Sequence, residues 1–97
     1  MHVQLRVPAA LREGGGGHSV LSFDLDDGST VDDLLDAIAS GYPALERRIR
    51  DEQGVLRPHV NIFVGEENIR SQSGAGTVLR TGSEVSILPA ISGGFDR

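Results

Sequence analysis

Hydrophobic and polar residues alternate in four segments of the chain, and this period-two pattern predicts β-strands with one buried face. The pattern runs over residues 2–7, 20–25, 59–64 and 84–88. Because proline has no N–H to donate to a sheet, we expect Pro89 to end the pairing of the last strand. The first two segments are joined by a loop and predict a hairpin.

Between the second and third of these segments, the repeat changes to that of a helix over residues 31–40. Its aliphatic side chains fall on one helical face: Val31, Leu34, Leu35 and Ile38. Thr30 is a suitable N-cap, and Asp33 completes the acidic form of a capping box. We expect Gly41 to end this helix, followed by Tyr42 and Pro43.

Weaker patterns complete the order of elements. Pro43 can open a second short helical segment, residues 69–70 predict a fragment of another strand, and Val78 and Leu79 are expected to return to the core. The order is then β-β-α-β-(β)-β. It predicts an α+β protein with one main helix packed on one face of a mixed, four- to five-stranded sheet, which fits the β-grasp arrangement. We expect one domain over residues 1–91 and a flexible tail over residues 92–97.

Composition excludes several classes of function. The chain has 97 residues, which suit one domain, and a net charge of −5, which argues against nucleic-acid binding. It contains neither a long apolar run nor a signal-peptide pattern, so we expect no membrane partner and a cytoplasmic location. All nine basic residues are arginine and there is no cysteine. Lysine Schiff-base chemistry, disulfides and thiolate metal sites are therefore excluded.

No catalytic or metal-binding set emerges from the side chains. The glycine run 14–17 lacks the lysine and the helix of a phosphate-binding loop. The aspartates between positions 24 and 36 do not have the spacing of an EF-hand, and a solvated acidic edge explains them better. The three histidines lack zinc-ligand spacing, and no serine has a plausible base. We expect the protein not to be an enzyme and to bind no metal or cofactor itself.

The last segment is unusual because a strand leads directly into a thin, glycine-ended tail. Pro89, Ala90, Ile91 and Ser92 form an extended lead to Gly93 and Gly94. Two glycines without Cβ atoms fit a channel as narrow as a backbone. A frayed terminus is the alternative interpretation of the tail alone.

Two side chains on the other strand face suggest a docking patch. Phe63 and Leu88 lie out of phase with their core neighbours and predict an apolar patch for a partner. Ordinary exposed hydrophobic residues, or cover from the second helical segment, are the alternative.

Three stretches together resemble the ubiquitin-like sulfur carriers of the MoaD/ThiS family, in particular the cysteine-biosynthesis branch. They are TVDDLLDAI, HVNIFVGEENIR and TGSEVSILPAISGG, and they cover most of the chain in the family's order. The resemblance implies that Gly94 supplies the working group, its C-terminal carboxylate. An E1-like partner would adenylate this carboxylate with ATP, and sulfur would then replace AMP to give a thiocarboxylate. A sulfur-acceptor enzyme would take the sulfide, and in this branch that is a PLP-dependent cysteine synthase.

The chain departs from the family pattern after Gly94, because Phe95, Asp96 and Arg97 follow. Carriers act with the second glycine at the terminus. The resemblance therefore implies cleavage between Gly94 and Phe95 by a zinc-dependent, JAMM-type peptidase.

Several other functions are compatible with this sequence. A ubiquitin-like modifier would be conjugated through Gly94 to a target lysine. The small subunit of molybdopterin synthase and an interaction domain with an inert tail are further alternatives. The sequence leaves open which pathway receives the sulfur.

Overall fold

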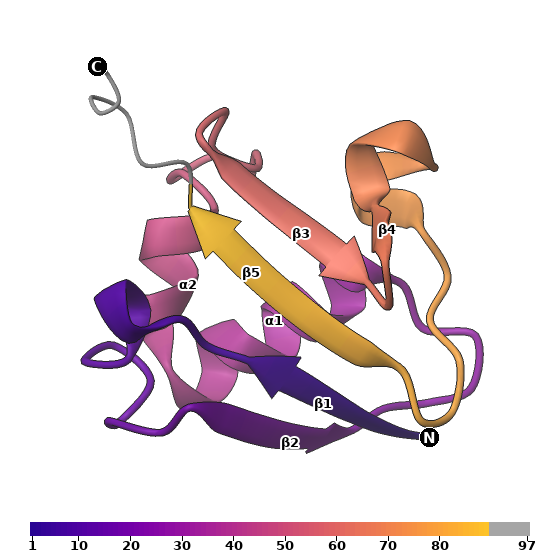
Figure 1. Cartoon of the computed structure of the whole chain (residues 1–97), viewed down its shortest axis with the longest axis horizontal. Coiled ribbons are helices and arrows are strands. Elements are labelled where there is room, and N and C mark those ends of the chain that lie inside the picture. The colour runs from indigo at the N-terminus through magenta and orange to yellow at the C-terminus, as the bar shows by residue number, and fades with distance from the viewer. Residues whose placement is uncertain (90–97) are drawn as a thin grey trace.

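A computed structural model describes residues 1–89 of the chain, and its elements follow the predicted order closely (Figure 1). The strands are β1 (His2–Arg6), β2 (Val20–Asp24), β3 (Val60–Val64), β4 (Glu67–Asn68) and β5 (Glu84–Pro89). The helices are α1 (Val31–Gly41) and α2 (Pro43–Ile49). Short 3-10 turns, η1 (Ala9–Leu11), η2 (Ile69–Ser71) and η3 (Gly74–Gly76), lie in the connections.

The five strands form one mixed sheet in the order β2-β1-β5-β3-β4. β1 pairs with β2 antiparallel, which confirms the hairpin, and with β5 parallel. β5 pairs with β3 antiparallel on its other side. The first and last long strands are therefore adjacent and parallel inside the sheet, as the β-grasp arrangement requires, and β5 occupies the centre (Figure 1).

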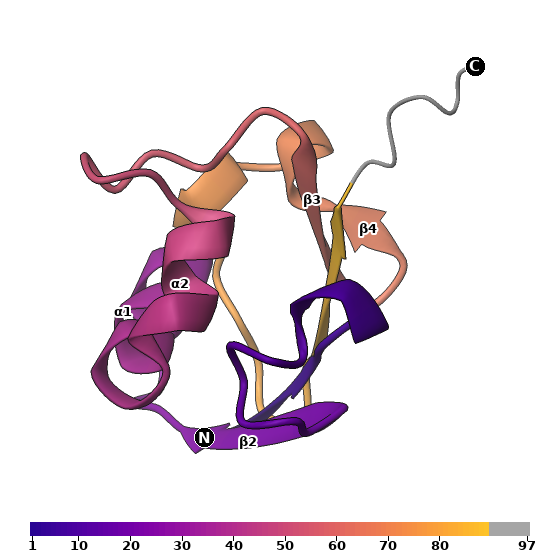
Figure 2. The same ribbon diagram turned by 90° about the vertical axis from the view of Figure 1, so that its left-hand side faces the viewer.

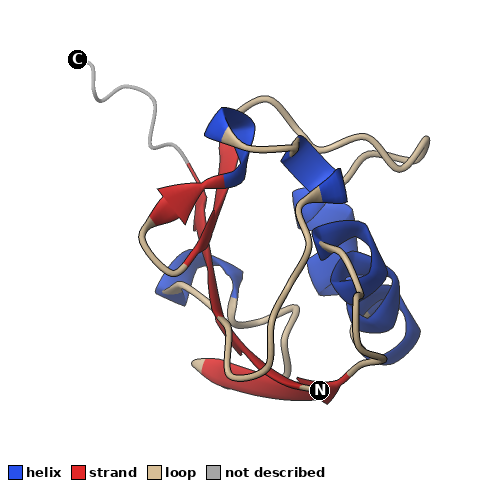
Figure 3. Cartoon of the chain, turned by 90° about the vertical axis from the view of Figure 1, so that its right-hand side faces the viewer, coloured by secondary structure: helices blue, strands red, loops and turns tan. Residues whose placement is uncertain are grey.

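Both helices cover the same face of the sheet (Figure 3). The predicted face of α1 is buried, and Leu34 and Ile38 have no exposed surface. The sheet contributes alternate residues to this core, including Val85 and Ile87. Thr30 caps α1 as predicted: its Oγ1 accepts from the Asp33 amide at 3.3 Å, and the Asp33 carboxylate accepts from the Thr30 amide at 2.9 Å. The α+β sheet-and-helix prediction is confirmed.

Two predicted boundaries lie one or two residues away from their expected positions. α1 runs one residue past the predicted end at Ser40, so that Gly41 is its last residue and the Tyr42 amide still donates to the Ile38 carbonyl at 2.6 Å. Tyr42 is the C-cap and leaves the helical conformation with a φ of −139°, as the residue before a proline favours. The strand fragment expected at residues 69–70 lies two residues earlier, as β4. The Asn68 side chain accepts from the Arg70 amide at 2.9 Å and turns the chain into η2.

One single-residue expectation fails, and one strand end lies a residue later than expected. Val78 is 57% exposed, while its neighbour Leu79 is buried, because consecutive residues of an extended segment point to opposite sides. Pro89 is the last residue of β5 and is in register with Val60, so the strand extends one residue past the predicted segment 84–88. β1 pairs with β5 only as far as Ser86, so β5 has a single neighbour, β3, at Pro89, and a proline is tolerated there.

The glycine run brings the β1–β2 connection against α2. A Cβ added at Gly14 would lie 2.9 Å from the Leu45 backbone nitrogen, which is closer than side chains allow. Gly14 therefore permits a backbone-to-backbone approach, and it fixes η1 and the start of α2 side by side. This contact forms one end of the molecule, onto which Figure 2 looks.

Candidate functional site

The candidate site is the end of the sheet where β5 stops. β5 is paired with β1 over its first half, where Leu5 lies opposite Val85, and with β3 as far as its end, where Val60 lies opposite Pro89. Pro89 is the last described residue. The predicted working residues lie outside the described range: Ala90, Ile91, Ser92, Gly93, Gly94 and Phe95. Their roles stay predictions, as do the domain end at residue 91 and the flexible tail at residues 92–97.

The structure places the two predicted docking residues on the outer face of the sheet, away from the helices. Leu88 is 49% exposed and Phe63 is partly buried. They are diagonal neighbours, because Phe63 is in register with Ser86 and Leu88 with Asn61. Polar residues therefore flank each of them, and their role in docking stays a prediction.

Basic side chains from separate segments line two hollows, and each hollow adjoins the end of β5. Arg12 lines a hollow together with Leu88 and Ile87 of β5. A second hollow is lined by Arg47, Arg48, Arg57 and His59, and His59 directly precedes Val60, the partner of Pro89. We call Arg12, Arg47, Arg48, Arg57 and His59 the basic collar. No sequence pattern indicates this collar, because its members are far apart along the chain and share no periodicity.

One further arginine, Arg50 at the end of α2, joins the two helices. Its Nε donates to Glu46 at 2.9 Å, and its terminal nitrogens donate to Asp32 at 3.3 Å and Asp36 at 3.0 Å. Burial alone would lower the pKa of Arg50, but the hydrogen bonds to Asp36 and Glu46 outweigh it and the pKa is raised. We call these four residues the arginine clasp. It fixes α2, and with it Arg47 and Arg48, against α1.

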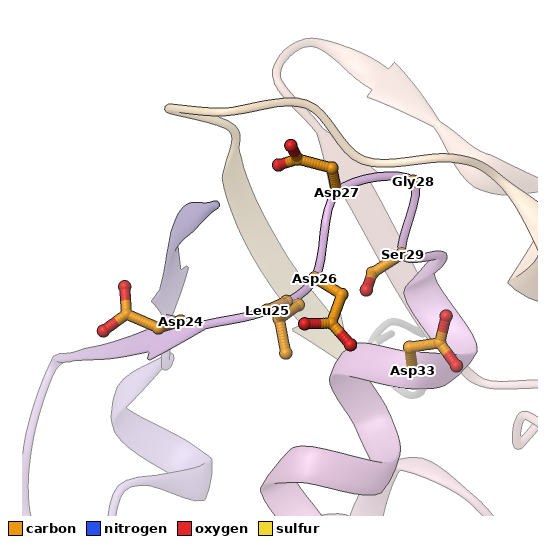
Figure 4. Close-up of a pocket in the computed structure, with 7 residues that line it drawn as sticks. All are labelled: Asp24, Leu25, Asp26, Asp27, Gly28, Ser29 and Asp33. Atoms are coloured by element: carbon orange, nitrogen blue, oxygen red, sulfur yellow. The ribbon is translucent and has the colours of Figure 1, made fainter.

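Acidic side chains gather at the opposite end of the molecule, between β2 and α1 (Figure 4). Asp24, Asp26, Asp27 and Asp33 line one open hollow there. Among residues 1–89, no cluster of histidine, aspartate or glutamate side chains is arranged to hold a metal ion. Asp33 is already used as the helix cap. In the same range, neither helix is long and apolar enough to cross a membrane.

Comparison with known proteins gives full-length matches. The sequence is 32% identical to "Sulfur carrier protein CysO" of Mycobacterium tuberculosis over 96 residues, which cover 97% of this chain and all of the relative. It is 34% identical over 94 residues to "Small archaeal modifier protein 3" of Haloferax volcanii, with coverage of 97% and 100%. The fold matches one chain in the crystal structure of the Amycolatopsis orientalis BexX/CysO complex with a TM-score of 0.80 at 27% identity, covering 94% of this chain and 98% of that chain.

The family model of the ThiS family matches residues 5–94, from β1 to the second glycine of the tail. The match covers nearly the whole described domain and stops before Phe95. Relatives of this length are carriers or modifiers by name rather than enzymes. The chain belongs to the ThiS family, and it has the ubiquitin-like β-grasp fold of the CysO-type sulfur carriers.

Proposed function

We propose that this protein is a sulfur carrier that works through the carboxylate of Gly94 once Phe95, Asp96 and Arg97 have been removed. The observation that carries the proposal is the extent of the family match, which ends at Gly94 and leaves the last three residues out. The geometry of β5 supports it. β5 is the central strand of the sheet, and the tail follows directly after it.

The chemistry requires one substitution at the α-phosphorus of ATP and then two at the carbonyl carbon of Gly94. The Gly94 carboxylate attacks the α-phosphorus of ATP in an E1-like partner and releases pyrophosphate, which gives an acyl-adenylate. A sulfide donor then attacks the carbonyl carbon and expels AMP, which leaves a thiocarboxylate. The sulfur next attacks an electrophilic acceptor, and water cleaves its bond to the carrier and restores the Gly94 carboxylate. This protein supplies the acyl group and no catalytic side chain.

Cysteine biosynthesis is the pathway we propose, with a PLP-dependent cysteine synthase as acceptor and a JAMM-type peptidase for trimming. The full-length likeness to CysO supports this assignment. Because the relatives include modifiers as well as carriers, conjugation to target lysines is the second candidate function.

The test compares the full-length chain with a chain that ends at Gly94. Each is incubated with ATP, a sulfide source and the adenylating enzymes of the same genome, and intact mass is measured. We expect one oxygen to be replaced by sulfur in the shorter chain only. Equal reaction of both chains would contradict the trimming step, and no reaction of either chain would contradict the carrier function.

Two variants of the shorter chain sharpen the test. Gly94→Val should block the exchange, because a branched side chain does not fit a channel made for glycine. Gly76→Val is the matched control, since nothing lies within 4 Å of a Cβ at Gly76. Conjugation is tested separately: covalent adducts of the chain in a cell lysate would identify a modifier.

A further inference from the structure

We propose that the basic collar docks against carboxylates around the active-site entrance of the adenylating enzyme that activates this chain. The proposal rests on the proposed function and adds the surface by which the partner recognises the carrier. It is carried by the length of the tail, by the free charges of the collar and by the distribution of charge over the molecule.

Because the tail is short, the collar must lie close to the partner when Gly94 is in the adenylation site. Five residues separate Gly94 from Pro89, and a fully extended chain of that length spans at most about 18 Å. The Gly94 carboxylate reaches an adenylation site only if Pro89 lies within that distance of it. The side chains around Pro89 must then face the walls of the entrance. His59 adjoins this point through the Val60–Pro89 pair, and Arg12 adjoins it through the hollow shared with Leu88.

The arginines of the collar are available for a partner. In the described part of the chain, no carboxylate lies within ion-pair distance of Arg12, Arg47, Arg48 or Arg57, whereas Arg6 and Arg50 do form ion pairs. Glu13 lines a hollow with Arg48, and Asp51 and Glu52 line one with Arg57, without forming such pairs.

Within residues 1–89, Arg12 and Arg57 make hydrogen bonds to the backbone through their guanidinium groups, whereas Arg47 and Arg48 do not. Arg12 donates to the Val7 carbonyl and Arg57 to the Arg47 carbonyl, at 3.0 Å and 2.9 Å. Arg47 and Arg48 are exposed, and no hydrogen bond from either guanidinium is found within residues 1–89. These two are the residues to change in a test.

The charge of the whole molecule favours an acidic protein as the occupant. The chain carries −5 overall, and acidic side chains fill the hollow at the far end of the sheet. Such a molecule approaches a negative surface with its collar and tail first, since the opposite end is repelled. Arginine also pairs with carboxylates through two parallel hydrogen bonds. A nucleic acid fits less well, because the net charge is negative and no Phe, Tyr or Trp lines the hollows of the collar.

The experiment measures ATP–pyrophosphate exchange by the adenylating enzyme as the concentration of the carrier is varied. The carrier is used in the form, full-length or ending at Gly94, that is activated. The variants are Arg47→Glu/Arg48→Glu and the neutral Arg47→Gln/Arg48→Gln. Arg80→Glu is the matched control, because Arg80 is exposed, has no ion pair in the described chain and lies in the turn before β5, away from the collar. Thermal unfolding confirms that each variant is folded.

We expect the double glutamate variant to raise KM at least about tenfold at low salt with kcat unchanged, and the glutamine variant about threefold, because rim charges act on association. At high salt the effect should fall to about threefold or less, since the Debye length shortens to about 3 Å at 1 M. Arg80→Glu should stay within about twofold of the wild type.

Three results would overturn the proposal. Equal KM values for the double glutamate variant and Arg80→Glu would show that the collar is not at the interface. A loss of kcat that persists at high salt would indicate damage to the tail or fold instead. Tight, salt-sensitive binding of a single-stranded oligonucleotide that the glutamate changes abolish would make the collar a nucleic-acid site. If the wild type is activated by no adenylating enzyme, the proposed function fails, and this inference fails with it.

Discussion

Replacing Arg50 with methionine should destabilise the protein by about 3 kcal/mol, a value that follows from the exposure of its partners. Asp36 and Asp32 are 70% and 53% exposed and can return to water, so each of those pairs contributes less than about 1 kcal/mol. Glu46 is only 12% exposed. Removing one partner from a buried pair costs roughly 3–5 kcal/mol, and the lower end applies here because Glu46 lies on a short helix near the surface.

Urea and thermal unfolding measure this loss. For a domain of this size, the expected destabilisation lowers the unfolding midpoint by about 12–24 °C, with an unchanged dependence on denaturant. Arg48→Met is the matched control on the same helix, and as an exposed change it should cost about 0.5 kcal/mol or less. Adding Glu46→Gln to Arg50→Met should restore part of the stability, because the lone buried carboxylate is gone. Equal losses for Arg50→Met and Arg48→Met would refute the reasoning.

Three further predictions concern the same domain. Gly14→Ala should lower the free energy of unfolding in urea by about 1–3 kcal/mol, because the new methyl group would meet the backbone of α2. Gly41→Ala, in open space within α1, should raise it by up to about 1 kcal/mol. The reverse order would contradict the close approach of Gly14 to α2. Leu34→Ala or Ile38→Ala should each lower the free energy of unfolding by roughly 2–5 kcal/mol, since both side chains are fully buried. A smaller loss would place these side chains outside the core. The pKa of Arg50 is raised above its ordinary value, so its contribution to stability is complete below that ordinary value and is lost only as the pH rises through the folded pKa. The difference in unfolding free energy between wild type and Arg50→Met should therefore stay constant from about pH 7 to 10, and a fall within that range would contradict the assignment.

The parts of the fold that the sequence predicted are those where burial repeats with a fixed period. Val85 and Ile87 face the core because side chains of a strand alternate, and the face of α1 follows the helical repeat. β4 was misplaced because a strand of two residues has no period, and its position depends on the Asn68 cap. Val78 was misjudged because hydrophobic type alone does not tell which way a loop residue points.

The charged features depend on contacts that no local pattern encodes. Arg50 meets Asp32 and Asp36 across 18 and 14 positions of sequence. The basic collar is assembled by the sheet register and by the contact of Gly14 with α2. The candidate site itself was predicted from the opposite kind of signal, namely the near absence of side chains at Gly93 and Gly94. Its residues lie beyond Pro89, so their roles still depend on the mass experiment.

The position of β5 explains why a single end of this domain can serve all partners of the proposed cycle. An adenylating enzyme, a sulfur acceptor and a peptidase would each have to reach Gly94 along the same stretch from Pro89, which spans at most about 18 Å. Each must therefore approach the same end face, and two of them do not fit there at once. A tail on an edge strand could peel away and lengthen its reach, because an edge strand is paired on one side only. β5 is paired with β3 as far as Pro89 and with β1 over Glu84–Ser86, so it lies inside the sheet and does not detach as an edge strand could, and the partners must act in turn.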